Sequence, residues 1–287
     1  MSPYLEIKNL SVMYSNGHQA LKDINLKITE AKIYGLVGIN GAGKSTLFKS
    51  IMGFIKPNQG EIKIKGLDVK ASLKSKLISY VPQTEEVDWD FPILVKDLVL
   101  MGRYSHMNFL RIPKSIDRKI VDESLERVGM LKYKERQIGE LSGGQRKRIF
   151  VARSLAQKSQ LILLDEPFTG VDIKTEDSLI NLFKSLSKDG HLIITSTHNL
   201  GSVPRLCDEV ILLNRELIAQ GPVQSTFNQN NLSKTFGGKL RNFQVHGNQL
   251  HEDSDKRSIN VLSDDEIPLI FYGEQNNQSI VKKKKDD

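Results

Sequence analysis

A glycine-rich segment near the N-terminus constrains the fold of this chain more than any other feature. The apolar run KIYGLV leads into GINGAGKST and then LFKSIMG, the order of strand, glycine loop and helix. The fixed positions of the phosphate-binding loop are all matched. Glycines let backbone amides and the helix N-terminus wrap a phosphate, the lysine reaches the β/γ-phosphates, and the serine hydroxyl ligates Mg²⁺. We therefore expect the phosphates of a bound nucleotide to lie against Gly38, Asn40, Gly41, Ala42, Gly43, Lys44, Ser45 and Thr46.

Short apolar runs along the chain indicate the core of an α/β fold. The runs LISYV, LILLD, LIITST and EVILLN resemble strands buried on both faces of a parallel sheet. Earlier, DINLKITE and GEIKIKG alternate apolar and polar residues, which is typical of half-buried strands. We expect the parallel strands to form the core and the alternating strands to form a separate part.

Helical spacing dominates residues 84–140, where Val121, Leu125 and Val128 precede Gly129. We interpret this segment as a helical insertion between two strands of the parallel sheet. A further helix is expected from Thr175, as its cap, to a stop at Gly190. Its shared apolar face would be formed by Leu179, Leu182, Phe183 and Leu186.

Composition limits the class of protein without identifying it. The apolar runs are far shorter than the roughly 20 residues of a membrane span, and the N-terminus lacks a secretory signal. A single cysteine, Cys207, excludes an internal disulfide and fits a reducing cytoplasm. The net charge of +7 rises to +10 over residues 1–250, because the remainder holds nine acids and six bases. This excess fits nucleic acid, nucleotide phosphates or an anionic membrane surface equally well.

Two adjacent acids, Asp165 and Glu166, follow the apolar run LILL. A strand of this kind would carry Asp165 to its carboxyl end, where the carboxylate can hold a Mg²⁺ shell. Glu166 would then be placed to orient and deprotonate water. Two acids after a strand can also simply open a helix, but the phosphate-binding loop favours the catalytic interpretation.

Five motifs in a fixed order resemble the ATP-binding subunits of ABC transporters: the phosphate loop, VPQ, LSGGQ, LILLDEP and STH. The resemblance covers roughly residues 4–235. It implies that Gln83 senses Mg²⁺ and the attacking water, and that His198 contacts the γ-phosphate. Asp172, in TGVD where SALD is more usual, matches a dimer-contact loop, and Tyr14 matches an aromatic that stacks on adenine. The implied catalytic residues are Glu166, His198 and Gln83, and the implied Mg²⁺ ligands are Ser45, Gln83 and Asp165.

The segment LSGGQRKR lies at an expected helix start, which Ser142 can cap. Unpaired amides at a helix start form an anion site. In the family that this chain resembles, this site meets the γ-phosphate bound by a second copy of the subunit. The resemblance thus implies a homodimer that holds ATP against Ser142, Gly143, Gly144 and Gln145.

A narrower resemblance comes from VDWDFP, LMGRYSHMNFLR, DEPFTGVDIKTE and VLSDDEIPLIFYGE. These phrases are similar to the manganese, zinc and iron uptake branch, and most of all to manganese or iron import ATPases. The implied partners are membrane permease subunits and, indirectly, an extracellular or periplasmic metal-binding protein, with no nucleic acid. The implied location is peripheral, on the cytoplasmic face of the membrane. The alternative is a soluble ABC ATPase of iron–sulfur assembly or of nucleic-acid processing.

The resemblance also suggests how the chain is divided. We expect a P-loop NTPase of the RecA-like type with an N-terminal antiparallel β subdomain and an inserted helical subdomain. The ATPase domain would span residues 1–235, with the helical subdomain at about 84–150 and a partly disordered extension at 236–287.

Aromatic residues in the segment 84–113 suit a groove for a permease helix, or else pack the helical subdomain. These residues are Trp89, Phe91, Tyr104 and Phe109.

Overall fold

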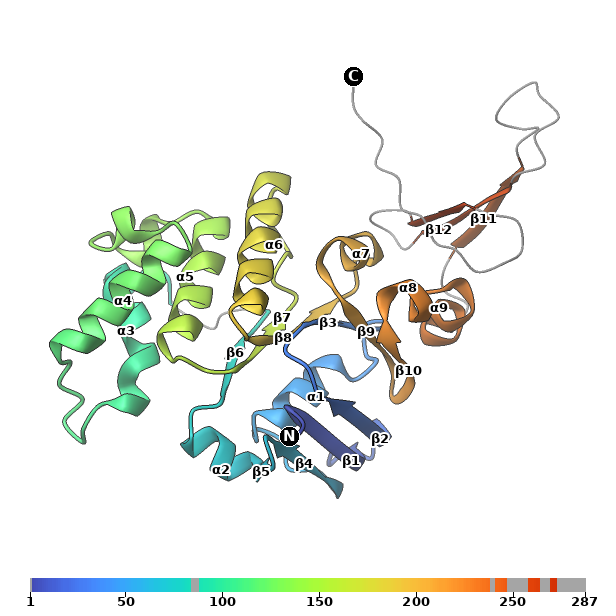
Figure 1. The fold of residues 1–287 in the computed structure, drawn as a ribbon, viewed down its shortest axis with the longest axis horizontal. Helices are drawn as coiled ribbons and strands as arrows, with labels where there is room; N and C mark the ends of the chain where they lie inside the picture. Colours follow the sequence, from blue (N-terminus) through green and yellow to red (C-terminus); the bar gives the residue numbers. More distant parts are fainter. Residues whose placement is uncertain (1, 84–87, 238–240, 247–257, 264–268, 273–287) are drawn as a thin grey trace.

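The structure is a computed structural model that describes residues 2–83, 88–237, 241–246, 258–263 and 269–272. Six strands form its central sheet (Figure 1): β3 (Ile33–Val37), β6 (Ile78–Val81), β7 (Leu161–Asp165), β8 (Leu192–Thr197), β9 (Glu209–Asn214) and β10 (Glu216–Pro222). Their order is β10-β9-β3-β8-β7-β6, and all neighbours are parallel except β10 and β9. Every residue of β3 and of β7 is buried. The expected parallel core is therefore confirmed.

A second sheet is antiparallel and contains the alternating segments. Its strands are β1 (Leu5–Met13), β2 (Gln19–Ile28), β4 (Gln59–Ile64) and β5 (Leu67–Asp68). They pair in the order β2-β1-β4-β5. Ile24, Leu26 and Ile28 alternate as buried residues along β2, so one face of this sheet is apolar and the other is polar. This sheet is the expected N-terminal β part.

A group of helices is inserted between β6 and β7, as the periodicity of residues 84–140 predicts (left side of Figure 1). Its buried face includes Val121, Leu125 and Val128. The last helix of the group continues past residue 150, the expected limit of the helical subdomain. The group comprises α3 (Val95–Leu100), η1 (Met101–His106), α4 (Ser115–Arg127), η2 (Leu131–Tyr133), η3 (Ile138–Glu140) and α5 (Gly143–Ala156).

The remaining helices lie close to the sheets. They are α1 (Lys44–Ile51), α2 (Val69–Lys74), α6 (Ile173–Lys188), η4 (Leu200–Ser202), α7 (Val203–Leu206), α8 (Val223–Thr226) and α9 (Gln229–Phe236). The expected cap of α6 is wrong: Asp172 caps the helix, and Thr175 donates its backbone amide to the Asp172 carboxylate. Gly190 follows the helix at a φ of 89°, as expected for a stop.

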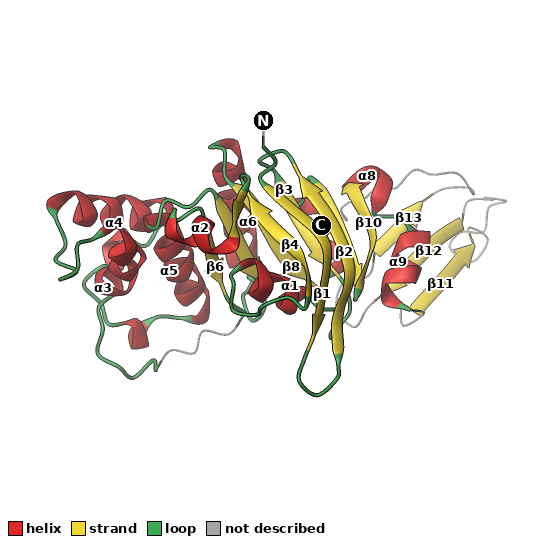
Figure 2. Cartoon of the chain, turned by 90° about the horizontal axis from the view of Figure 1, so that it is seen from below, coloured by secondary structure: helices red, strands yellow, loops and turns green. Residues whose placement is uncertain are grey.

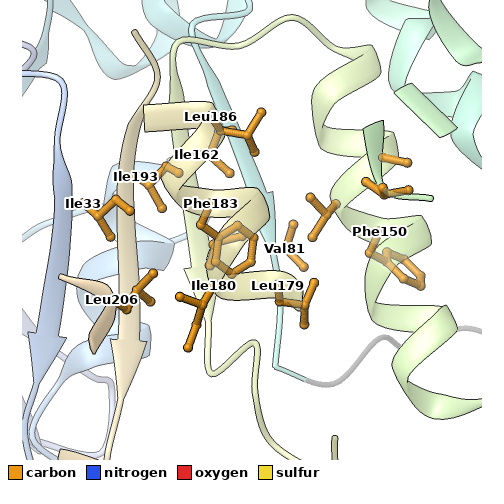
Figure 3. Packing of buried hydrophobic residues seen from close by; sticks show 14 of the residues in the cluster. Ile33, Val81, Phe150, Ile162, Leu179, Ile180, Phe183, Leu186, Ile193 and Leu206 are labelled. Atoms are coloured by element: carbon orange, nitrogen blue, oxygen red, sulfur yellow. The ribbon is translucent and has the colours of Figure 1, made fainter. Parts of the chain in front are cut away.

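The two faces of the central sheet pack against different partners. On one face, α5 and α6 contribute side chains such as Phe150 and Phe183 to an apolar cluster that also contains Ile162 and Ile193 of the sheet (Figure 3). On the other face, α1 and the antiparallel sheet pack together with the sheet (Figure 2). The apolar positions of α6 that were expected to share a face lie in or against the first cluster. The sheet therefore separates two hydrophobic cores.

Three further strands lie near the C-terminus: β11 (Arg241–His246), β12 (Ser258–Ser263) and β13 (Leu269–Tyr272). They form an antiparallel sheet in the order β11-β12-β13. No strands were expected here from the sequence, so the three strands correct the expectation of a partly disordered tail for these residues. The lysine run at 282–285 lies outside the described residues. Among the helices that are described, none combines the length and the apolar character of a membrane span.

Candidate active site

The glycine loop leaves the carboxyl end of β3 and enters α1 at Lys44. A Cβ on Gly38 would lie 2.2 Å from the carbonyl oxygen of Leu213 in β9. Gly43 has a φ of 98°, and a Cβ on it would lie 2.6 Å from the carbonyl oxygen of Ala20 in β2. Only glycine therefore fits at these two points, where the loop runs against its neighbours. Asn40 and Gly41 are exposed at the outer bend of the loop.

The ammonium group of Lys44 lies under this loop. Its Nζ donates to the carbonyl oxygens of Gly38 at 2.7 Å and Ile39 at 3.2 Å, and the residue is 6% exposed. Burial lowers the pKa of Lys44, while the negative charges of Glu166 and Asp165 oppose that shift. A buried cation at the edge of a glycine loop provides a site for a phosphate.

Asp165 ends β7, and both of its carboxylate oxygens accept a hydroxyl proton. Pairing of β7 with β8 places Ser196 beside it, and Ser196 Oγ donates to Asp165 Oδ1 at 2.5 Å. Tyr80, on the other neighbouring strand, donates its hydroxyl to Oδ2 at 3.1 Å. Burial and then the charge of Asp165 raise the pKa of Tyr80, so its hydroxyl stays protonated. Asp165 is thus held rigidly from two sides.

The three residues that were expected to be catalytic, Glu166, Gln83 and His198, lie together around the Glu166 carboxylate. Gln83 Nε2 donates to Glu166 Oε2 at 2.7 Å, and His198 Nδ1 lies 3.1 Å from Oε1. The Thr169 hydroxyl donates to Oε2 at 3.4 Å. The backbone amide of Glu166 donates to Ser196 Oγ at 2.9 Å, so Ser196 links the two acids. Glu166 is only 8% exposed, and its backbone has a φ of 49°.

These groups meet because β3, β6, β7 and β8 all end at one edge of the sheet. Carboxyl ends of parallel strands commonly meet at such an edge and bind ligands there. Tyr80, Ser196 and Thr169 were not predicted from the sequence, although each lies within or beside a recognised motif. The motif SYVPQ carries Tyr80, and STH carries Ser196. Their roles depend on strand register, which a single sequence does not specify.

Ser142 caps α5, as expected. Gln145 donates its backbone amide to Ser142 Oγ at 3.4 Å, and the Ser142 amide donates to Gln145 Oε1 at 3.0 Å. A Cβ on Gly144 would lie 2.8 Å from the Thr175 side chain, so the start of α5 lies against the start of α6. Ser142, Gly143, Gly144 and Gln145 are therefore grouped with the α6 cap.

Asp172 and Tyr14, which the resemblance also assigned to the site, lie away from the Glu166 carboxylate and from each other. Asp172 caps α6 and accepts protons from the Thr175 hydroxyl at 2.7 Å and the Thr175 amide at 3.0 Å, bonds that lower the pKa of Asp172. Tyr14 follows β1, and its hydroxyl lies 2.9 Å from the hydroxyl of Thr46 in α1. Tyr14 is thus connected to the phosphate loop, and its side chain remains partly exposed.

The aromatic residues expected to form a docking groove fall into two groups. Trp89 packs edge-on against Phe150 with ring centroids 6.1 Å apart, and the guanidinium of Arg146 lies 4.0 Å from its centroid. The alternative interpretation, packing within the helical part, therefore applies to Trp89. Tyr104 is half-buried, whereas Phe91 and Phe109 are exposed.

Comparisons with known proteins agree with this geometry. The family model described as ABC transporter matches residues 21–169. The chelated iron transport system membrane protein YfeB of Yersinia pestis is 55% identical over 96% of this chain and 93% of its own. The manganese transport system ATP-binding protein MntA of Synechocystis is 55% identical over 82% and 90%. The zinc transport system ATP-binding protein TroB of Treponema pallidum is 39% identical over 82% and 88%.

Solved structures give the same result. A metal-chelate type ABC transporter in an inward-facing conformation superposes with a TM-score of 0.74 at 29% identity, over 87% of this chain and 94% of that one. The protein cbiO1 of Clostridium perfringens, part of the ABC transporter complex cbiONQ, gives 0.70 at 31% identity, over 82% and 94%. The chain therefore belongs to the ABC transporter family, as an ATP-binding subunit that hydrolyses ATP.

Proposed function

We propose that this subunit hydrolyses ATP to drive the import of a divalent transition-metal ion through a partner permease. The observation that carries the hydrolytic part is the position of Glu166, whose carboxylate is held by Gln83 and His198 beside Asp165. The transport part is supported by relatives that are named for chelated iron, manganese and zinc transport. Relatives with these names do not favour iron–sulfur assembly or nucleic-acid processing.

In this proposal, the loop amides and Lys44 bind the phosphates of ATP. The buried ammonium of Lys44 donates to the carbonyl oxygens of Gly38 and Ile39, which places a positive charge under the glycine loop. Glu166 accepts the proton of the attacking water, Gln83 orients that water, and His198 bonds the γ-phosphate. Such positioning accounts for most of the catalysis in phosphoryl transfer.

The oxygen atoms around Asp165 also fit a Mg²⁺ ion. Each oxygen of Asp165 uses one lone pair for a hydroxyl donor and keeps another, and hard oxygen ligands of this kind are those that Mg²⁺ prefers. We propose that Asp165, Ser45 and Gln83 hold the ion, directly or through water. When bound, Mg²⁺ would neutralise charge on the β- and γ-phosphates. Tyr80 and Ser196 keep the Asp165 carboxylate in one orientation for this purpose.

We further propose that two copies of the subunit form the complete site. Ser142, Gly143, Gly144 and Gln145 of one copy would contact the γ-phosphate bound by the other. Asp172 would lie in the contact between the copies, and Tyr14 would stack on adenine. The capping box of Ser142 leaves the start of α5 well defined, which supports its use as an anion site.

The proposed assembly is a homodimer bound to permease subunits on the cytoplasmic face of the membrane. An extracellular or periplasmic protein would deliver the metal. Within the subunit, we assign residues 1–235 to the ATPase domain and 236–287 to a separate extension. The alignment with the Yersinia relative supports an extension common to both proteins, because it covers 275 residues of this chain's length.

Uptake of radioactive manganese, iron and zinc by cells that lack the protein tests the transport role. We expect the uptake of one of these metals to fall and to be restored by the parent protein but not by Glu166→Gln. An exposed carboxylate elsewhere, Glu216, provides a matched control, since Glu216→Gln should restore uptake fully. Unchanged uptake of all three metals in the deleted strain would contradict the proposal.

A further inference from the structure

The loop that precedes α4 ends in an apolar turn, at the left-hand end of Figure 1. The amide of Arg111 donates to the Asn108 carbonyl oxygen at 2.9 Å, which closes the turn. Its two central residues are Phe109, which is 99% exposed, and Leu110, which is 69% exposed. Central positions of turns usually hold Gly, Pro, Asn, Asp or Ser. A phenylalanine and a leucine there expose apolar surface that contributes nothing to the fold of the isolated chain.

Two isoleucines that follow the turn, the second of them in the first turn of α4, are also exposed. Ile112 is 57% exposed and Ile116 is 54% exposed. We call Phe109, Leu110, Ile112 and Ile116 the tip patch. Four exposed apolar side chains within eight residues mark an interaction site more often than single exposed residues do.

A buried ion pair fixes the base of the tip patch. Arg103 Nε donates to Asp117 Oδ1 at 3.1 Å, and both side chains are less than a tenth exposed. Arg103 also donates to the Ala156 carbonyl oxygen at 2.9 Å, and the Lys114 amide donates to Asp117 Oδ2 at 3.0 Å. The turn is thus presented on a rigid support.

Basic residues surround the tip patch. Asp117 is the only acid among residues 107–119, and Arg103 neutralises it in the interior. The exposed charge of this segment is therefore entirely positive. Its exposed bases are Arg111, Lys114, Arg118 and Lys119.

We propose that the tip patch inserts into the headgroup region of a bilayer that contains anionic phospholipids. The apolar side chains of the tip patch suit the boundary of the acyl chains, and the bases around them suit the lipid phosphates above that boundary. Lys119 lies 3.9 Å from the Glu123 carboxylate, and lipid phosphates can neutralise the other three bases without a fixed geometry. The turn is also convex, whereas a permease helix calls for a groove. This contact does not depend on the transport function, because it needs neither nucleotide nor permease.

Vesicle flotation with the purified full-length protein tests the proposal. In every protein tested, Lys282 to Lys285 are replaced by glutamine, so that the terminal lysine run does not contribute to vesicle binding. The protein with this change alone is called the parent. Vesicles of phosphatidylcholine with phosphatidylglycerol should carry the parent upward, and vesicles of phosphatidylcholine alone should not. The double variant Phe109→Ser/Leu110→Ser should lose roughly a hundredfold in affinity, because two large apolar side chains no longer leave water.

Three controls keep the result interpretable. Phe54 is also exposed, at 66%, but it lies outside the basic segment, so Phe54→Ser should float like the parent. Arg111→Gln/Lys114→Gln should weaken binding and reduce its dependence on salt. ATPase activity and the urea midpoint of the double variant should match those of the parent. A parent that does not float, or a folded double variant that floats equally well, would overturn the proposal.

A photoreactive benzoylphenylalanine at position 109 distinguishes lipid from protein in native membranes. We expect adducts with phospholipid. Adducts with permease subunits alone would assign the tip patch to protein docking and overturn the lipid contact.

Discussion

The ammonium of Lys147 donates a hydrogen bond of 2.6 Å to the backbone carbonyl oxygen of Gln83. Lys147 lies in the first turns of α5, whose start is capped by Ser142. The side chain of Gln83 in turn bonds Glu166. A continuous set of contacts therefore connects the start of α5 to the proposed general base of the same subunit. If the partner's nucleotide binds at Ser142, its presence can be transmitted along this route.

We therefore expect Lys147→Met to lower kcat about tenfold, because loss of one hydrogen bond from a charged group raises the barrier by about 1.5 kcal/mol. Lys147→Arg keeps the donor and should restore most of the rate. The Hill coefficient for ATP should fall in Lys147→Met, since communication between the two sites is weakened. Lys188→Met removes an exposed lysine at the end of α6 and is the control. Equal Hill coefficients in all four proteins would exclude a positioning role.

Glu166→Gln should abolish turnover while ATP remains bound. The amide cannot accept the proton of water, and loss of a general base costs about 10²–10⁴-fold in rate. The variant should therefore accumulate as an ATP-bound dimer, which size-exclusion chromatography with ATP and Mg²⁺ would detect. A folded variant that elutes only as a monomer would argue against the two-subunit site.

Tyr80→Phe and Ser196→Ala each remove one hydroxyl from Asp165. Partners that orient a metal ligand typically contribute about 10–100-fold to metal affinity. We expect the Mg²⁺ concentration for half-maximal ATPase to rise roughly tenfold in each variant. Tyr34 is a buried tyrosine in β3, away from Asp165, so Tyr34→Phe should leave this concentration unchanged. Unaltered Mg²⁺ dependence in Tyr80→Phe and Ser196→Ala would remove these hydroxyls from the metal site.

Asp117→Asn should destabilise the helical part by roughly 3–5 kcal/mol, because it leaves Arg103 buried without its partner. Burial raises the pKa of Asp117, but bonds from the Lys114 amide and Arg103 outweigh it and hold the pKa below its usual range. The pair therefore contributes fully above about pH 4, the ordinary pKa of an aspartate, and its contribution is lost as pH falls through the lower, folded value.

Urea unfolding at several pH values measures both effects. The parent should lose this part of its free energy of unfolding in acid, and Asp117→Asn should not. Asp122 lies in the same helix as Asp117 but pairs with Lys134, which follows η2, and both side chains of this pair are partly exposed, so Asp122→Asn should cost about 1 kcal/mol or less. Equal losses of unfolding free energy in Asp117→Asn and Asp122→Asn would show that the buried pair with Arg103 stabilises the protein no more than an exposed pair does.

Local motifs could be predicted from the sequence because neighbouring residues determine them. The phosphate loop, the burial of β7 and the Ser142 cap each depend on fewer than about ten consecutive residues. The helical insertion was also predictable, since Val121, Leu125 and Val128 repeat with helical spacing.

Contacts between distant segments were not predictable in the same way. Ser196 meets Asp165 across 31 positions because of strand register, and Lys147 meets Gln83 across 64. Trp89 could face either a partner or the protein interior, because an aromatic ring suits both environments. The C-terminal strands were missed because that region is polar overall and its short apolar segments are isolated. The choice between Asp172 and Thr175 as a cap depended on backbone geometry.

The left-handed backbone of Glu166 has a consequence for the evolution and engineering of this site. A non-glycine residue at a φ of 49° costs roughly 1–2 kcal/mol relative to its preferred conformation. A glycine there would relieve the strain, but it would also remove the carboxylate and its bonds from Gln83 and Thr169. Selection for thermal tolerance alone would therefore act on the backbone strain at this position without regard to catalysis. Stabilisation screens of this enzyme need an activity filter.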